Sequence, residues 1–187
     1  MNDAMNIAGE KNPVDQATKD LLAYAFDRED VKWLMEKLHQ DADINRTTVE
    51  YELQVLKIIS TGWAISYHLE GSPNKNPLLE QFWKQVFDFS NELSKTTNTM
   101  TGTRLDYFEV LKERLEAYVT AISKSSEATA ANDPGLAVGP EFAGICGNSE
   151  DLHTRMAGIT MFATVVTRVG AYLTAMSIPE ESDDSNP

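Results

Sequence analysis

Two Glu-x-x-His pairs come closest to the spacing of a metal site in this sequence. They are Glu36 with His39 and Glu150 with His153. In carboxylate-bridged di-iron bundles, two such pairs point into the bundle and join two further glutamates. Here each pair lies at a predicted helix end and away from the apolar face beside it. The sequence therefore predicts solvated helix-end residues at both places and no metal site.

A second candidate is a calcium-binding loop in residues 41–52, where oxygen-bearing side chains occupy the ligand positions of such a loop. The position that needs glycine for the sharp turn is Arg46 instead. Thr47 followed by Glu50 is typical of a capping box, so the start of a helix explains the same residues. Calcium is not predicted as a ligand.

Cys146 is the single cysteine of the chain, and it lies in a glycine-rich stretch. A lone cysteine cannot form an intramolecular disulfide, and no histidine is placed beside it as a base. No Gly-Lys-Ser/Thr follows, so the glycines do not form a phosphate loop. We predict no catalytic residue and no cofactor. The N-terminus has no signal-peptide pattern, so a cytoplasmic location is expected.

Aromatic side chains recur at helical spacing in two segments and could line a pocket for an apolar or planar ligand. The residues singled out for such a pocket are Ser60, Trp63, Tyr67 and Trp83. Aromatic residues at this spacing are more often part of a hydrophobic core, and the sequence leaves both alternatives open.

Apolar residues recur every three or four positions along most of the chain, which predicts helices and no strand. Residues 44–69 carry two apolar stripes, so this helix is expected to be covered on two sides. The predicted fold is an all-α helical bundle of four long helices plus one or two short N-terminal helices. A long loop, residues 125–148, is expected before the last helix because it is rich in Ala, Gly, Pro and Asn.

The segment Met156–Ile178 carries one charged residue, Arg168. Its length is sufficient to span a bilayer. Several threonines dilute its hydrophobicity, and a central arginine disfavours insertion. A membrane span is therefore not expected, and the segment is predicted to be a helix with a neighbour on each side.

On a helical wheel this segment has one oily face and a second face of small residues. The second face is the candidate interface, and its residues are Thr160, Thr164, Thr167, Arg168, Ala171 and Thr174. Small side chains let two backbones approach closely. The face is expected to meet another helix of the domain, a second copy of the chain, or water. In a two-fold homodimer, Arg168 would reach a carboxylate across the interface.

The chain has 187 residues and a formal net charge of −13. This length fits one domain. We expect a single helical domain at residues 13–178, between disordered tails at residues 1–12 and 179–187. Binding to a phosphate backbone needs a basic surface, so nucleic acid is not expected as a partner.

The sequence favours a non-enzymatic protein that acts through protein–protein contacts, as an adaptor, regulator or inhibitor, and that forms homo-oligomers, most simply a homodimer. An acidic surface without a convergent set of nucleophile, base and metal ligands supports binding over catalysis. The alternative is a helical protein or enzyme that binds a small ligand or metal inside the bundle.

Overall fold

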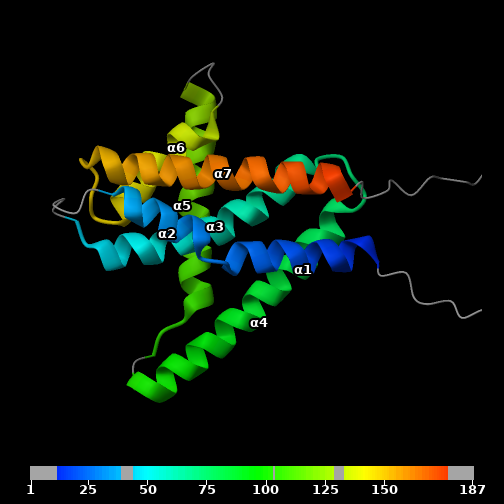
Figure 1. Ribbon diagram of the computed structural model, residues 1–187, viewed down its shortest axis with the longest axis horizontal. Coiled ribbons are helices and arrows are strands. Elements are labelled where there is room, and N and C mark those ends of the chain that lie inside the picture. Colours follow the sequence, from blue (N-terminus) through cyan, green and yellow to red (C-terminus); the bar gives the residue numbers. More distant parts are fainter. Residues whose placement is uncertain (1–11, 39–43, 103, 129–132, 177–187) are drawn as a thin grey trace, which may run out of the picture.

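The computed structural model describes residues 12–38, 44–102, 104–128 and 133–176, and these residues form seven helices and no strand (Figure 1). In chain order the helices are α1 (Pro13–Phe26), α2 (Glu29–Lys37), α3 (Arg46–His68), α4 (Lys75–Thr101), α5 (Tyr107–Ala128), α6 (Pro134–Ile145) and α7 (Leu152–Met176). The all-α fold class predicted from the sequence is confirmed.

Helix α3 lies at the centre and contacts each of the other six helices. Its buried residues include Leu53 and Leu56 from one predicted apolar stripe, and Val55 and Ile65 from the other. A helix that is apolar on two sides must be covered on two sides, so its sequence accounts for the central position.

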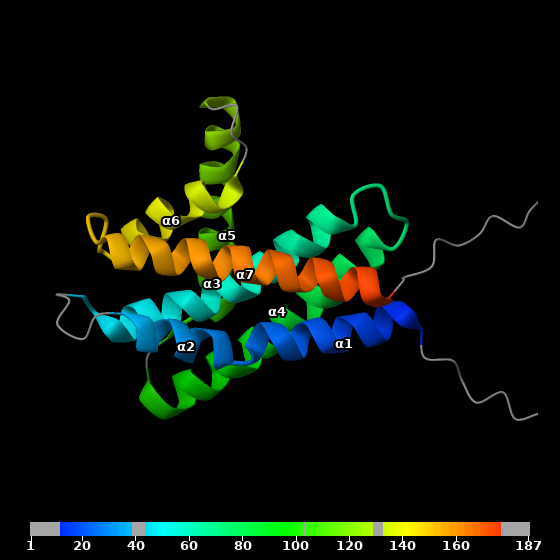
Figure 2. The same ribbon diagram turned by 45° about the horizontal axis from the view of Figure 1, so that its top comes forward.

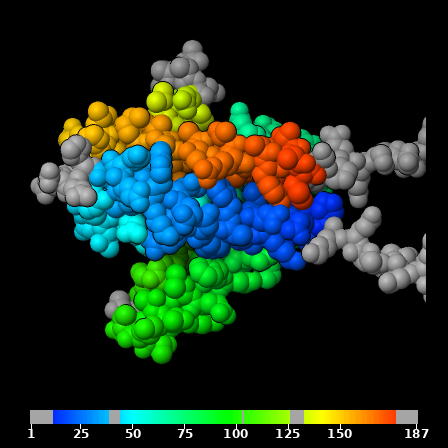
Figure 3. Space-filling view, viewed as in Figure 1, coloured from blue at the N-terminus to red at the C-terminus, as the bar shows by residue number. Residues whose placement is uncertain are grey.

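The other helices surround α3 unevenly. Helices α1, α2 and α7 lie together on the face seen in Figures 1 and 3, and α5 crosses behind them at a steep angle. Helix α4 passes obliquely behind α1. Its C-terminal end projects from the body of the molecule (Figures 1 and 2). This divergence of α4 from α3 leaves a hollow that the next section describes.

The predicted loop at residues 125–148 is wrong, because helix α6 occupies half of it. The Asp133 side chain caps this helix by accepting from the Gly135 backbone N–H at 2.9 Å, and a proline starts its first turn. A Cβ at Gly139 would lie 2.5 Å from Ile159 Cγ1, and a Cβ at Gly158 would lie 2.8 Å from the Phe142 side chain. The glycines that suggested a loop therefore permit close packing of α6 on α7.

The predicted tails, residues 1–12 and 179–187, lie outside the described residues except for Asn12. The Asn12 side chain accepts from the Val14 backbone N–H at 3.0 Å and caps α1. Helix α4 is the longest of the seven and ends at Gly102, whose positive φ of 68° suits a glycine C-cap.

Helix α7 is the one helix in the described residues whose length and hydropathy are sufficient for a membrane span. Length and composition alone are weak support for a span, because core helices of soluble proteins meet the same criterion. One face of α7 is buried against α3 and α6. Its buried residues include Met161, Val165 and Val169.

Candidate functional site

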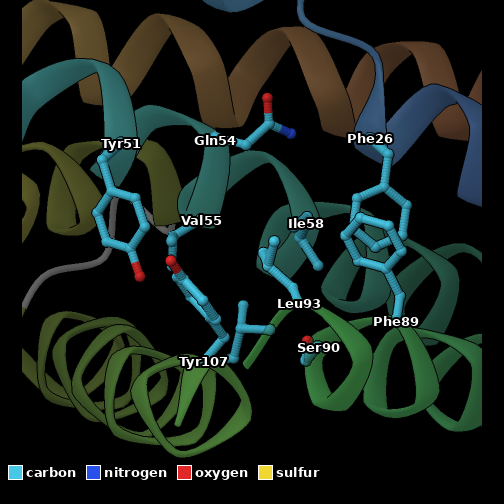
Figure 4. Close-up of a pocket in the computed structure, with 10 residues that line it drawn as sticks. Phe26, Tyr51, Gln54, Val55, Ile58, Phe89, Ser90, Leu93 and Tyr107 are labelled. Carbon is cyan, nitrogen blue, oxygen red and sulfur yellow. The ribbon is translucent and has the colours of Figure 1, made fainter. Parts of the chain in front are cut away.

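An open apolar groove lies where α4 and α5 diverge from α3, beside the end of α1 (Figure 4). We call it the α3–α4–α5 groove, and its volume is about 240 Å³. Its lining residues are Phe26, Tyr51, Gln54, Val55, Ile58, Phe89, Ser90, Leu93, Tyr107 and Leu111. An adjoining hollow of about 510 Å³ shares half of these residues and adds Arg28, Thr47 and Glu50 at the rim.

Large apolar side chains in this groove are exposed to solvent. Tyr51 is 38% exposed, Phe89 is 50% exposed and Leu93 is 38% exposed. The rings of Phe26 and Phe89 contact each other at a tilt of 50° with centroids 4.4 Å apart, which joins α1 to α4 at the groove (Figure 4). A contiguous exposed apolar surface of this kind is typical of a binding site.

Polar groups in the groove are few. The Gln54 amide Nε2 donates to the Ala25 carbonyl at 2.7 Å, while Gln54 Oε1 is buried without a hydrogen-bond partner. At the rim, the guanidinium of Arg28 pairs with the carboxylate of Glu50. This pair is charge-balanced, so the surface of the groove is mainly apolar.

A charged cluster beneath the α1–α2 corner joins four helices. Lys57 of α3 has a fully buried side chain, and its Nζ lies 3.0 Å from Asp30 Oδ2. The same Nζ donates to the Asp27 carbonyl at 3.0 Å and lies 4.3 Å from the centroid of the Tyr24 ring. Arg168 Nη1 of α7 donates to Asp30 Oδ1 at 2.7 Å. Burial, with Asp30 nearby, raises the pKa of the Tyr24 hydroxyl.

A second buried cluster joins α3, α5 and α6. Glu52 is 3% exposed, and it accepts hydrogen bonds from Arg114 Nε at 3.1 Å and Nη2 at 3.0 Å. Burial, followed by the charge of Glu52, raises the pKa of the Cys146 thiol to about 12. The same two causes raise the pKa of the Tyr118 hydroxyl. Cys146 is therefore protonated at neutral pH and is a poor nucleophile, because the thiolate is the reactive form.

The predicted pocket residues do not line the α3–α4–α5 groove. Ser60 and Trp63 border a cavity of only about 10 Å³. The Trp63 and Tyr67 rings stack on each other with centroids 4.9 Å apart. The Trp83 ring packs against Gly62, where a Cβ would lie 2.4 Å from a ring carbon. In the structure the Trp63 and Trp83 rings pack on their neighbours, and Tyr67 is 56% exposed.

The predicted small-residue interface lies along one side of α7. Thr167, Ala171 and Thr174 are exposed, while Thr160 and Thr164 are partly buried. Arg168 finds its carboxylate within the same chain, at Asp30. The ion pair that the homodimer hypothesis assigned to a second copy is thus made without one.

The metal-like motifs stay apart in the described residues. Glu36 and His153 are exposed on different helices, and His39 lies outside the described part of the chain. Asn45 is the N-cap of α3, since its side chain accepts from the Thr48 backbone N–H at 3.1 Å, so the prediction of Thr47 as N-cap is wrong. Among the described residues, no three His, Cys, Asp or Glu side chains gather where they could hold a metal ion.

Sequence reasoning missed both the groove and the Lys57 cluster. Apolar periodicity predicts which face of a helix is apolar, but it does not reveal where two helices diverge and leave such a face open. The signal for the cluster was a lysine inside the apolar run Val55–Ile59. A buried ammonium group at that position must be paired with a carboxylate, or it must lose its charge.

The chain was compared with protein-family models, with curated proteins and with solved structures. No protein-family model, no curated protein and no solved structure matches it. The function of the chain is therefore argued from its own geometry.

Proposed function

We propose that this chain is a non-enzymatic helical protein that acts through protein–protein contacts, with the α3–α4–α5 groove as its docking surface. The occupant is an apolar helix of a partner protein. The observation that carries the proposal is an open groove, walled by three helices, that leaves Tyr51, Phe89 and Leu93 partly in solvent.

The α3 wall of the groove is long enough for two turns of a partner helix to lie along it. This wall extends from Tyr51 to Ile58, which is two helical turns or about 10 Å at 1.5 Å per residue. Two turns of an apolar stripe present several side chains at i, i+3, i+4 and i+7, the arrangement used in helix-in-groove recognition. The groove and its adjoining hollow are open, so a partner can dock without an opening step.

The net charge of −13 favours partners with a basic surface. Long-range attraction of this kind raises the association rate, whereas apolar contacts inside the groove hold the complex. Added salt should therefore slow association more than it speeds dissociation.

We also propose that the chain forms a homodimer through the small-residue face of α7. The exposure of Thr167, Ala171 and Thr174 supports this proposal, since no other helix in the described residues covers them. Small side chains at a two-fold axis let the α7 helices of two copies approach closely.

A matched pair of leucine substitutions tests the docking surface. Leu93→Asp places a carboxylate in the groove, and Leu136→Asp places one on α6, where the leucine is 57% exposed outside the groove. Tagged chains are expressed in the source cells, and co-purified proteins are quantified by mass spectrometry. We expect Leu93→Asp to reduce recovery of a specific partner at least tenfold, and Leu136→Asp to leave it unchanged.

Circular dichroism of both variants checks that the helices are retained. Equal recovery of every co-purified protein with the two variants would contradict docking at the groove. If Leu93→Asp instead dissociates a homodimer, the groove binds a second copy and the proposed partner is wrong.

A further inference from the structure

The two ends of the α3–α4–α5 groove differ in chemistry (Figure 4). The rings of Phe26 and Phe89 form one end, whereas Tyr51 and Tyr107 point their hydroxyl groups toward each other at the other end. The side chain of Leu93 lies between the two ends and adds apolar surface. A partner helix in the groove would therefore meet two hydroxyl groups at one end of its apolar stripe.

Tyr107 is the first residue of α5, and two hydrogen bonds fix it against α4. Its backbone N–H donates to Ser94 Oγ at 3.1 Å, and its hydroxyl oxygen lies 3.4 Å from Thr97 Oγ1. Either hydroxyl can be the donor of the second bond. Because a phenol both donates and accepts, one of these capacities stays open to a ligand whichever hydroxyl donates.

The Tyr51 hydroxyl has no hydrogen-bond acceptor in the part of the chain that the structure describes. Tyr51 is 38% exposed, and a docked helix would remove much of that contact with water. Burial, followed by the charge of Glu52 and then Tyr107, raises the pKa of Tyr51, so the hydroxyl keeps its proton at neutral pH. A buried hydroxyl is unfavourable unless it is hydrogen-bonded, so a well-matched partner supplies an acceptor at this end.

We propose that Tyr51 and Tyr107 set the register of the partner helix by hydrogen bonding to one amide side chain, asparagine or glutamine, in its apolar stripe. This inference rests on the proposed function, because it specifies the helix that docks in the groove. The amide oxygen accepts from the Tyr51 hydroxyl, and the amide N–H donates to the Tyr107 hydroxyl, which in turn donates to Thr97. A single polar residue in an apolar helix interface fixes the register, because every other register leaves it unpaired.

An uncharged side chain is favoured over a charged one at this position. None of the ten described residues that line the groove is charged. An ammonium or carboxylate group would therefore lose its hydration without gaining a counter-ion there. An amide is neutral and both donates and accepts, so it matches the two phenols.

Selection from a display library of helical peptides with one randomised face tests the proposal. The library is selected against the full chain and, in parallel, against a chain with both Tyr51→Phe and Tyr107→Phe, which keeps the two rings and lacks the two hydroxyls. We expect asparagine or glutamine to be enriched at one stripe position by the wild-type chain. The double variant should enrich an apolar residue at that position instead.

Titration by fluorescence anisotropy measures the effect of the hydroxyls on one peptide. The tightest peptide from the wild-type selection is compared with its analogue that carries leucine in place of the amide residue. The double variant should bind the amide peptide about fivefold more weakly than the wild-type chain does, because neutral hydrogen bonds are lost. It should bind the leucine analogue as tightly as the wild-type chain does.

Tyr67→Phe is the control, since Tyr67 lies on α3 outside the groove, and it should leave both affinities unchanged. Circular dichroism verifies that each variant retains its helices. Selected peptides with an entirely apolar stripe, or with a charged residue at the enriched position, would overturn the amide assignment and leave the docking surface intact. No enrichment, or equal binding of the selected peptides to the Leu93→Asp chain, would contradict the proposed function and the inference with it.

Discussion

Lys57 illustrates how a single residue fixes the packing of several helices. Its ammonium group is removed from water and is compensated by Asp30, by the Asp27 carbonyl and by the Tyr24 ring. A buried charge with full compensation gives little net stability, but loss of one partner leaves the others uncompensated. The cluster therefore specifies where α1, α2 and α7 sit on α3.

Lys57→Met keeps the length of the side chain and removes its charge. We expect a loss of about 3 kcal/mol in the free energy of unfolding, because Asp30 stays buried without its ammonium partner. Urea unfolding monitored by circular dichroism measures the loss. The control is Lys84→Met, which breaks an exposed pair with Asp88 and should cost at most about 1 kcal/mol. Equal losses in the two variants would refute the assigned role.

Titration of the Cys146 thiol lowers the free energy of unfolding as the pH rises above about 9. Its pKa is raised from 9.0 to about 12 in the folded state, so the unfolded thiol loses its proton first. The contribution is fully present below about pH 9 and is lost as pH rises toward 12. Tyr24 and Tyr118 act in the same direction.

Cys146→Ala should therefore flatten the decline of stability above about pH 9, by at most about 1.4 kcal/mol per pH unit. Urea unfolding at a series of alkaline pH values measures the slope for both chains. An unchanged or steeper slope in the variant would mean that the thiol does not titrate as assigned.

At the scale of elements, α6 and α7 show what sequence patterns can and cannot predict. The long helices were predictable, because apolar periodicity reports directly on a buried helix face. Helix α6 was not, because its glycines and prolines match a loop by local propensity, while the helix is stabilised by its packing on α5 and α7 in addition to its N-cap. Tertiary contacts overrode propensity here.

Two glycines of α6 test this account as a matched pair. Gly139→Ala would place a Cβ 2.5 Å from Ile159 Cγ1 and 2.9 Å from the Arg155 carbonyl, so we expect a loss of about 1–3 kcal/mol. Gly144→Ala meets nothing closer than 3.7 Å, and it should be neutral or gain about 0.5–1 kcal/mol of helix propensity. Urea unfolding compares them, and a Gly139→Ala chain as stable as Gly144→Ala would contradict the packing.

At the scale of the whole molecule, the groove exists because α4 and α5 diverge from α3. The apolar positions of α3, α4 and α5 were predictable as stripes, but the stripes do not distinguish the exposed Tyr51, Phe89 and Leu93 from the buried residues beside them. Periodicity gives the face of a helix and not its crossing angle, so it cannot predict where α4 leaves α3. The exposed apolar surface follows from that angle.

The homodimer proposal also belongs to this scale. Ala171→Glu would bring two carboxylates together at the small-residue face, so we expect the dimer to dissociate. Sedimentation velocity at high protein concentration measures the state, with Val119→Glu on α5 as a control outside the face. A wild-type chain that sediments as a 20.8 kDa monomer would remove the proposal.

The central claim is that a partner protein docks in the α3–α4–α5 groove, and site-specific photo-crosslinking in the source cells tests it most directly. A photoreactive amino acid replaces Phe89 in the groove or, as a control, Leu136 on α6. The account predicts one crosslinked partner from position 89, none from position 136, and loss of the crosslink when Leu93→Asp is added. Identical crosslinks from both positions, or none from position 89, would contradict it.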